Sequence, residues 1–451
     1  MRKSNVDMLN GPIVKGLLSL AVPIMIMNLL QSMFNIIDMT VLKMYADDMS
    51  VGAIGVCGSL TVLATTFLAG LSTGANIVVA RRIGEKNKDA ADKAAMTSIL
   101  LAIVSGLLFM VIGVVFAEFF LKLTKCPSAL LPEATVYFKL YFCSVPILMV
   151  YNFCASILRA IGDTKRPMYF LTIGGIIKVL FTFLFVCHLD MEVKGVGIAT
   201  IISTLVACVL VLIKVVKFQD VVDIDFKKLK FTITELKSIM FIGVPAGIQG
   251  ALYCFANVVI TTAVNSYGEY ATTGISIANQ FDGILYQIAL APSYAVAPYV
   301  AQNIGAGNLK RVKQTVVRAI LITIAFAASL GSLSAIFSGQ LSSIMSSNPA
   351  VIAYSQEKMI IVSSTYFICG INEVFCGVLR GMGKPIIPTI SSLIFLCLLR
   401  FVWVYFIFPL CPNFTFLYTV WPVGWTLSIV TLFTAYVASM SKLKRQSVYS
   451  S

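Results

Sequence analysis

The sequence predicts an all-α integral membrane protein, in which twelve transmembrane helices form two six-helix bundles related by a pseudo-twofold axis along the membrane normal. Three observations predict this fold. Of the 451 residues, 58% are hydrophobic and only 12% are charged, whereas soluble proteins have roughly 25% charged residues. Apolar runs long enough to cross a bilayer recur along the chain. Short motifs also recur, separated by nearly half of the chain.

Apolar runs of about 20 residues mark the expected spans. The first run is too long for the apolar part of a signal peptide, so we expect it to be a retained helix. The twelve runs cover roughly residues 15–42, 52–80, 94–117, 136–158, 168–187, 195–216, 238–265, 272–300, 315–337, 355–378, 387–409 and 415–438. The longest polar stretch separates spans six and seven. We therefore expect an N-terminal bundle at 1–220, a cytoplasmic linker at 221–237 and a C-terminal bundle at 238–451.

The basic residues predict the orientation. The formal net charge is +14, and most of the 34 lysines and arginines fall on one side of the expected spans when both termini are placed in the cytoplasm. Lys358 is among the few that are expected on the outer side. Basic residues gather at the cytoplasmic ends of spans, so the charge requires no nucleic-acid partner. We expect a multi-pass protein of the plasma (inner) membrane with both termini cytoplasmic.

Three repeats indicate a duplicated half. "ILRAIGDTKRP" at 157–167 matches "VLRGMGKPIIP" at 378–388, and "VARRIGEKN" at 79–87 matches "VAQNIGAGN" at 300–308, both at an offset of 221. Pro23 matches Pro245 at an offset of 222, which also places Asn35 opposite Asn257. Six spans are an even number, so both halves cross the membrane with the same polarity, and such pairs of bundles are typical of alternating-access transporters. The repeated turns are interpreted as structural, and both prolines as helix hinges.

These motifs resemble the multidrug and toxic compound extrusion (MATE) family over nearly the whole chain. The resemblance rests on Pro23 and Asp38 in "PIMIMNLLQSMFNIIDMTVLKMY", on the repeated turns above and on "GVGIAT" at 195–200. It implies a secondary antiporter that exports organic cations or amphipathic drugs in exchange for H⁺ or Na⁺. It also implies that Asp38 couples transport to the cation. We expect no cofactor besides the coupling ion, and a monomer in the lipid bilayer.

Ionisable residues inside spans are functional candidates because each costs several kcal/mol to bury. Asp38 lies in the first span, where it would load a proton or ligate Na⁺ with oxygens of Asn35, Asn152 or Thr182. Lys178 lies in mid-span, four residues before Thr182, so the two share a helix face. A Lys178–Asp38 ion pair would keep Asp38 ionised until a proton or substrate breaks it. The alternative is that Asp38 and Lys178 extend towards the membrane interface.

Further candidates lie in the second half. A carboxylate with aromatic walls suits an organic cation, and the candidates for substrate binding are Glu373, Asp282, Tyr253, Phe281, Tyr286 and Asn257. Ordinary packing of the aromatic rings and structural hydrogen bonds of the acids are the alternatives. Arg400, also within a span, is expected to pair with Glu373 or Asp282.

Other function classes find less support. The sequence has no P-loop for ATP, and His188 is its one histidine, so neither an enzyme nor a His/Cys metal site is expected. Cys126 and Cys411 fall in expected outer loops and could pair. The alternative function is a flippase for lipid-linked precursors. Its cavity would need to be strongly cationic, whereas only Lys178 and Arg400 are basic residues expected inside spans.

Overall fold

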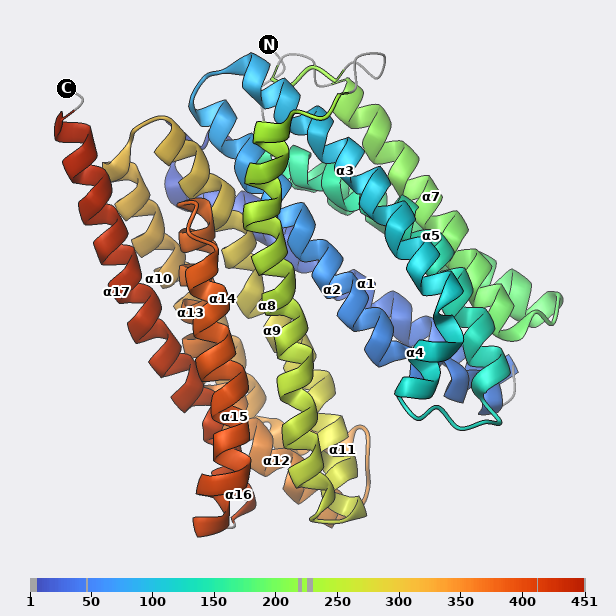
Figure 1. Ribbon diagram of the computed structural model, residues 1–451. Helices are drawn as coiled ribbons and strands as arrows, with labels where there is room; N and C mark the ends of the chain where they lie inside the picture. Colours follow the sequence, from blue (N-terminus) through green and yellow to red (C-terminus); the bar gives the residue numbers. More distant parts are fainter. Residues whose placement is uncertain (1–5, 46–47, 218–220, 225–229, 412, 450–451) are drawn as a thin grey trace. The chain divides into compact units, whose positions relative to one another are not determined.

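The computed structural model describes residues 6–45, 48–217, 221–224, 230–411 and 413–449, which form helices and short connections without any strand (Figure 1). Within these residues, eleven helices are long and apolar enough to cross a membrane, and one bent pair makes a twelfth span. The twelve predicted spans are thereby confirmed. The spans are α1 (Ile13–Tyr45), α2 (Asp48–Gly84), α3 (Lys88–Val115), α5 (Leu131–Ile161), α6 (Lys165–Phe183) with the π-helix η1 (Leu184–His188), α7 (Glu192–Val216), α8 (Ile233–Asn265), α9 (Glu269–Gly305), α10 (Leu309–Ile336), the pair α12 (Pro349–Ser364) and α13 (Tyr366–Gly381), the series α14 (Ile386–Ser392), η3 (Leu393–Leu398), α15 (Leu399–Val402), η4 (Trp403–Ile407) and η5 (Phe408–Leu410), and α16 (Phe414–Tyr418) with α17 (Val420–Tyr449). The short helices α4 (Ala117–Leu123) and α11 (Ser338–Ser343) lie between spans.

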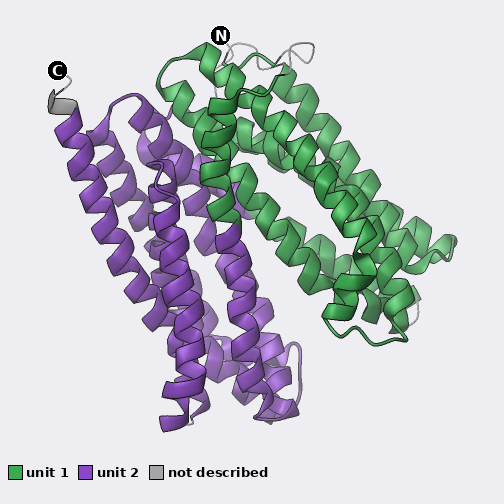
Figure 2. Cartoon of the chain, in the orientation of Figure 1, with its two compact units in different colours: residues 1–6, 26–247 green, residues 7–25, 248–451 purple. Residues whose placement is uncertain are grey.

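The helices pack into two compact units (Figure 2). Unit 1 contains residues 26–247, and unit 2 contains residues 7–25 and 248–451. The division falls shortly after Pro23 in α1 and shortly after Pro245 in α8. The two divisions are separated by the same offset as the two prolines. Each half therefore gives the first part of its first helix to the other half's unit.

Close backbone packing explains why the start of α8 belongs to unit 1. Two pairs of glycines, each with three residues between them, face one another: Gly70 with Gly74 on α2, and Gly243 with Gly247 on α8. A Cβ added at Gly70 would lie 2.2 Å from the backbone nitrogen of Gly247, and one added at Gly74 would lie 2.3 Å from the carbonyl oxygen of Ile239. Such small-residue pairs let membrane helices approach closely. Any side chain larger than hydrogen would separate these helices.

In each unit, the repeated turn after the second span of one half contacts the chain at or shortly before the start of the other half's first helix. In unit 1, Arg82 at the end of α2 pairs with Glu235 near the start of α8 at 2.9 Å. In unit 2, the Asn303 side-chain amide donates to the carbonyl oxygen of Met8 at 3.1 Å, and Arg311 Nε donates to the same oxygen at 3.0 Å. The predicted structural role of these turns therefore has a physical basis.

The predicted linker is attached to unit 1. The backbone N–H of Asp223 donates to Asp92 Oδ1 at 2.7 Å, and that of Thr232 donates to Thr97 Oγ1 at 3.1 Å. Residues 225–229 of the predicted linker lie outside the described residues. The predicted bundle boundary at this linker stays a prediction.

The tenth span is bent by 46° between α12 and α13, which the sequence analysis did not predict. Thr365, at the break, has φ −101° and ψ 5°, outside helical values. Its hydroxyl donates to the carbonyl oxygen of Ile361 at 2.8 Å, and Ser364 Oγ donates to that of Ile360 at 2.5 Å. Hydroxyls that bond the preceding turn compete with the helical ladder and bend helices. The bend therefore coincides with consecutive hydroxyl residues that bond the preceding turn.

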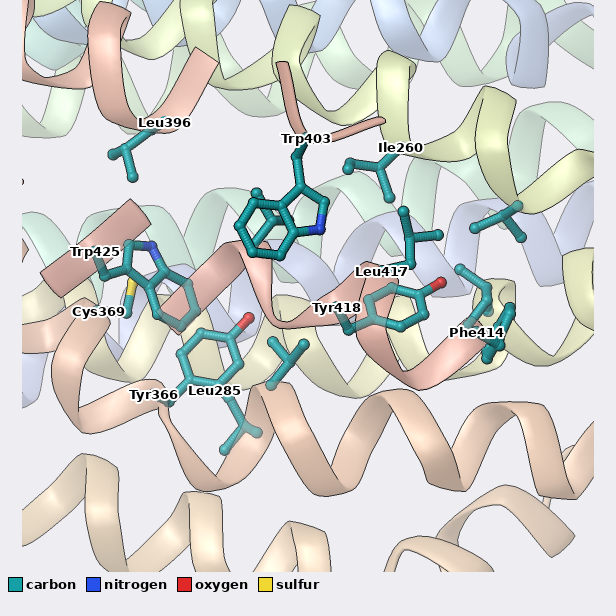
Figure 3. Packing of buried hydrophobic residues seen from close by; sticks show 14 of the residues in the cluster. Ile260, Leu285, Tyr366, Cys369, Leu396, Trp403, Phe414, Leu417, Tyr418 and Trp425 are labelled. Atoms are coloured by element: carbon teal, nitrogen blue, oxygen red, sulfur yellow. The ribbon is translucent and has the colours of Figure 1, made fainter. Parts of the chain in front are cut away.

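The core of unit 2 is rich in aromatic side chains (Figure 3). Trp403, Tyr418 and Trp425 are buried there beside Tyr366 of α13. Tyr366 lies 5.7 Å from Trp425 between ring centroids, and Trp403 lies 5.2 Å from Phe416. This aromatic core lies among the broken helices of spans ten, eleven and twelve, which supply these rings.

Candidate functional site

The structure brings Asp38, Lys178 and Thr182 together in unit 1. Lys178 Nζ lies 2.5 Å from Asp38 Oδ2, and Thr182 Oγ1 donates to Asp38 Oδ1 at 3.1 Å. The side chains of Lys178 and Asp38 are 15% and 7% exposed, and Thr182 is fully buried. The expected ion pair is therefore present, and neither residue extends to the interface. The role of these three residues in coupling stays a prediction.

Local packing sets the geometry of this pair. Lys178 and Thr182 lie one turn apart on α6, so both reach α1 from the same helix face. Gly175 lies three residues before Lys178, and a Cβ there would overlap the ring of Phe34, one turn before Asp38. The missing side chain at Gly175 thus lets α6 approach α1. One turn beyond the pair, these helices contribute Val41, Leu42 and Val186 to an apolar cluster with Val196 that excludes water from that side.

The remaining predicted oxygen ligands do not join this pair. Asn35 is exposed on α1 and Asn152 is half-buried on α5, and neither hydrogen-bonds to Asp38 among the described residues. The part of the chain that the structure describes holds no group of three His, Cys, Asp or Glu side chains suited to a metal ion. Lys178 already lies at the carboxylate oxygen that Na⁺ would need. The predicted Na⁺ site at Asp38 thus lacks most of its expected oxygens in this arrangement.

The two predicted acids of unit 2 also have partners. Asp282 Oδ2 lies 2.7 Å from Lys358 Nζ, and both side chains are nearly buried. Lys358 also donates to Asn279, and the Tyr366 hydroxyl donates to the backbone carbonyl of Asp282 at 3.2 Å. Lys358, which was expected on the outer side, is buried in α12, where it is 3% exposed. The basic residues inside the described spans therefore include Lys358.

Glu373, on α13, accepts a hydrogen bond of 2.7 Å from the hydroxyl of Tyr253 on α8. Beside it, Gln249 accepts from Arg380 at 2.5 Å and donates to Ser392 Oγ at 2.8 Å. The repeated Arg380 therefore bonds a side chain on another helix.

The predicted aromatic residues Phe281 and Tyr286 are half-buried, and Tyr286 packs against the aromatic core. Their role in substrate binding, like that of Glu373 and Asp282, stays a prediction. The two cysteines that could pair, Cys126 and Cys411, are both free thiols.

Arg400 lies on α15, at the same offset from Lys178 as Pro245 from Pro23. It is 5% exposed. Its Nη1 donates to Asn257 Oδ1 at 2.6 Å, and its guanidinium lies 4.7 Å from the ring centroid of Trp421. The expectation that Arg400 pairs with Glu373 or Asp282 is wrong, since within the described chain those acids bind Tyr253 and Lys358 instead. The offset of the prolines does not identify Asn257 as the partner, because the counterpart of Asp38 is Ile260.

Aromatic rings connect the two buried cations of unit 2. Trp421, under the Arg400 guanidinium, stacks on Tyr418 with 5.3 Å between centroids. The opposite cation, Lys358, lies 5.9 Å from the centroid of Tyr418. Cations over ring faces are attracted by the ring quadrupole. No signal in the sequence indicated the roles of Lys358, Tyr418 and Trp421, because none of them lies in a repeated motif.

Comparison with known proteins identifies a family model and several relatives that match this chain. The MatE family model matches residues 23–184 and 245–406, two stretches that are again separated by the offset of the prolines. A probable multidrug resistance protein, YpnP of Bacillus subtilis, is 26% identical over 88% of both chains. The FAD transporter of Shewanella oneidensis is 24% identical over 88% of both chains. The multidrug export protein MepA of Staphylococcus aureus is 23% identical over 85% of both chains.

Solved structures share the fold. A multidrug resistance MATE family transporter of the MOP superfamily in an outward-facing conformation superposes with a TM-score of 0.91, covering 99% of this chain and 100% of that chain at 18% identity. A MOP superfamily transporter from Pyrococcus furiosus superposes with a TM-score of 0.87 at the same identity, covering 98% and 99%. These likenesses establish two six-helix halves of the MATE fold. Because the family model covers most of both halves, the chain belongs to the MatE family of multidrug and toxic compound extrusion transporters.

Proposed function

We propose that this protein is a secondary antiporter that exports small amphipathic molecules in exchange for protons, by alternating access of its two halves. The observation that carries the proposal is the buried pair of Asp38 and Lys178, with Thr182 on the second carboxylate oxygen. An ionisable pair inside a membrane span costs free energy unless both charges stay paired. Such a pair changes its stability when a proton neutralises one member. Two six-helix halves with the same polarity suit this kind of transport.

A proton that binds Asp38 removes the negative charge that holds Lys178. The ammonium group then lies in a poorly hydrated place without its counter-ion, which favours a conformation that brings it to water. Pro23, fifteen residues before Asp38 in α1, removes one backbone hydrogen bond and so permits bending of that helix. Protonation at Asp38 is thereby linked to the geometry of α1. The release of the proton restores the pair.

Sodium is the weaker candidate for the coupling ion. Na⁺ at Asp38 would have to displace an ammonium group that lies 2.5 Å from the carboxylate. It would also need several further oxygen ligands, whereas Thr182 supplies one. A proton needs no ligand shell and binds at a single oxygen. The Lys178 side chain thus already fills the place that a metal cation would take.

The test uses the full chain reconstituted into phosphatidylcholine vesicles. Uptake of ethidium is followed by fluorescence under an imposed pH gradient, and separately under an imposed Na⁺ gradient at constant pH. We expect the pH gradient to drive transport and the Na⁺ gradient to have no effect. Asp38→Asn, which cannot exchange a proton, should lower the pH-driven rate by roughly 100-fold, as for the loss of an essential proton-transfer group.

The matched control is Asp89→Asn. Asp89 forms an exposed pair with Lys93 at 2.6 Å on α3, so the same chemical change is made at a pair outside the proposed site. Wild-type transport is expected for this variant. Full pH-driven transport by Asp38→Asn, or transport driven by Na⁺ alone, would overturn the proposal.

The names of the relatives leave the substrate class open. Two relatives above are named for multidrug resistance or export and one for FAD; FAD is an anion because of its diphosphate. Organic cations are the substrates that the family resemblance implies, and Asp282 and Glu373 are their proposed contacts. No observation favours the flippase alternative over export of small molecules. Neither proposal requires a catalytic residue or a cofactor.

A further inference from the structure

The geometry points to an oxyanion-binding site at Arg400 in unit 2, which accepts the carboxylate, sulfonate or phosphate group of an amphipathic substrate. This inference rests on the proposed function for the statement that the bound molecule is transported. It differs from the expectation of a purely cationic substrate. The observation behind it is a buried guanidinium that has no carboxylate partner among the residues that the structure describes.

The local charge balance favours an anion. Arg400 and Lys358 are both buried and share the stacked pair of Tyr418 and Trp421. Lys358 is neutralised by Asp282, whereas the amide of Asn257 that binds Arg400 carries no charge. A buried charge is normally paired, because its desolvation is costly. One positive charge in this region therefore lacks a counter-ion within the described chain.

The two acids that were expected to pair with Arg400 have other partners. Glu373 accepts a hydrogen bond from the hydroxyl of Tyr253, and Asp282 forms an ion pair with Lys358. Neither carboxylate lies within ion-pair distance of Arg400 in the described structure. A ligand is then the remaining source of a negative charge for this guanidinium.

The site also has spare hydrogen-bond donors. A guanidinium carries five N–H groups, and the described chain engages one nitrogen of Arg400, through Asn257. Trp403 Nε1 and Tyr418 Oη are buried, and no partner for either is found in the described chain. Figure 3 shows these two rings in the same aromatic core. Unsatisfied buried donors call for an explanation; the proposed oxyanion is bound by the N–H groups of Arg400 that the described chain leaves unused.

The α8 face beside Arg400 is accessible. Asn257 and Thr261, one turn apart in the last third of α8, are both exposed. Polar side chains exposed within a span normally face a water-filled space and not lipid. A polar molecule can therefore reach Asn257 and, through it, the guanidinium.

The backbone around Arg400 is unusual. The four residues of α15 lie between two π-helical segments, η3 and η4. Such segments are rare and occur frequently at functional sites. They also free backbone groups from the regular ladder and re-aim the side chains between them. Span eleven is thus locally adapted where it carries Arg400.

The experiment measures equilibrium binding to the purified full chain in neutral detergent, so it does not depend on transport or on a coupling ion. Two xanthene dyes that differ mainly in charge serve as probes: fluorescein, which carries a carboxylate, and rhodamine 123, a cation in which this carboxylate is esterified. Fluorescence anisotropy gives each Kd. We expect fluorescein to bind more tightly than rhodamine 123. Arg400→Gln should weaken fluorescein binding by roughly tenfold or more, since it removes a charge-assisted hydrogen bond, and Arg400→Lys should weaken it less.

Asn257→Asp is the sharpest variant. It places a carboxylate of the same shape where Arg400 already donates, so it should pair the guanidinium and abolish fluorescein binding without disturbing the fold. Asn265→Asp adds the same charge elsewhere on α8 and should leave the Kd unchanged; Arg445→Gln is the corresponding control for Arg400→Gln on the exposed end of α17. Equal binding of both dyes, or fluorescein binding unaffected by Asn257→Asp, would overturn the inference.

A lipid phosphate is the other source of the same chemistry. Fluorescein binding is therefore repeated in nanodiscs of phosphatidylcholine and in nanodiscs with phosphatidylglycerol. Unchanged fluorescein affinity supports a substrate site. Competition by phosphatidylglycerol overturns the substrate assignment, because it identifies an anionic lipid as the occupant. Failure of proton-driven transport with intact fluorescein binding would refute the proposed function alone.

Discussion

The two halves of the molecule place a cation at the same position of the repeat and surround it differently. Lys178 in unit 1 and Arg400 in unit 2 are separated by the same offset as Pro23 and Pro245. Lys178 binds the carboxylate of Asp38, whereas the counterpart of Asp38 is Ile260, and Arg400 binds the neutral Asn257. The helix packing of the repeat has been kept while its ionic chemistry has diverged. A closed pair suits proton exchange, and a cation without a counter-ion suits a ligand.

The largest loss of unfolding free energy is expected when the carboxylate of Asp38 in unit 1 is removed. Asp38→Asn leaves Lys178 largely buried without a counter-ion, and breaking such a pair costs about 3–5 kcal/mol of unfolding free energy. The double variant Asp38→Asn with Lys178→Met removes both charges and should recover most of that loss. Arg400→Gln removes a cation that has no carboxylate and should cost clearly less than Asp38→Asn. Denaturant unfolding in detergent checks the order of these variants. An equal loss for Asp38→Asn and Arg400→Gln would contradict the difference between the halves.

The spans, the repeat and the ion pair of unit 1 were accessible from the sequence, whereas the partner of Arg400 was not. The spans follow from apolar length, and the repeat follows from Pro23, Pro245 and the turn motifs. Asp38 and Lys178 could be paired in advance because each is a single charge deep in an otherwise apolar run. The burial of Lys358 was not predicted because this residue lies near polar residues of α12, where hydropathy cannot distinguish a buried cation from one at the membrane surface. Its partner Asp282 is far away in sequence, and only the packing of α9 with α12 brings them together.

Backbone features were harder to predict than charges. The bend at Thr365 coincides with hydroxyl groups that bond carbonyl oxygens of the preceding turn, and the sequence alone does not determine which acceptor a hydroxyl bonds. The assignment of the first parts of α1 and α8 to the opposite units depends on tertiary contacts such as Arg82 with Glu235. A boundary drawn at the most polar connection does not take such contacts into account.

A second prediction concerns Ile260, the counterpart of Asp38 in unit 2, when it is replaced by the carboxylate that unit 1 has at this position. Ile260 is 4% exposed, so Ile260→Asn should cost about 2–5 kcal/mol through lost apolar contacts and a buried amide. The Asp side chain of Ile260→Asp has the same shape as the Asn side chain of Ile260→Asn and carries an additional negative charge. If it pairs with Arg400 as Asp38 pairs with Lys178, it should be the more stable of the two variants. Chemical unfolding of both variants measures this difference. A less stable Ile260→Asp would mean that Arg400 cannot reach this position, and the correspondence of the two cations would then be limited to sequence.

The smallest effect concerns a position where the two halves differ by one methyl group. Gly243 in unit 1 corresponds to Ala21 in unit 2, and a Cβ at Gly243 would lie 2.8 Å from the carbonyl oxygen of Leu71 and 2.9 Å from its Cα. These are backbone atoms, so the helices must separate to admit it, and overpacking of this kind costs about 1–3 kcal/mol. The reverse change, Ala21→Gly, creates no overlap and should cost about 1 kcal/mol or less, mainly through backbone entropy. Thermal unfolding should therefore show a larger decrease in Tm for Gly243→Ala than for Ala21→Gly. If Gly243→Ala is instead neutral, the close approach of α2 and α8 does not limit the packing of unit 1.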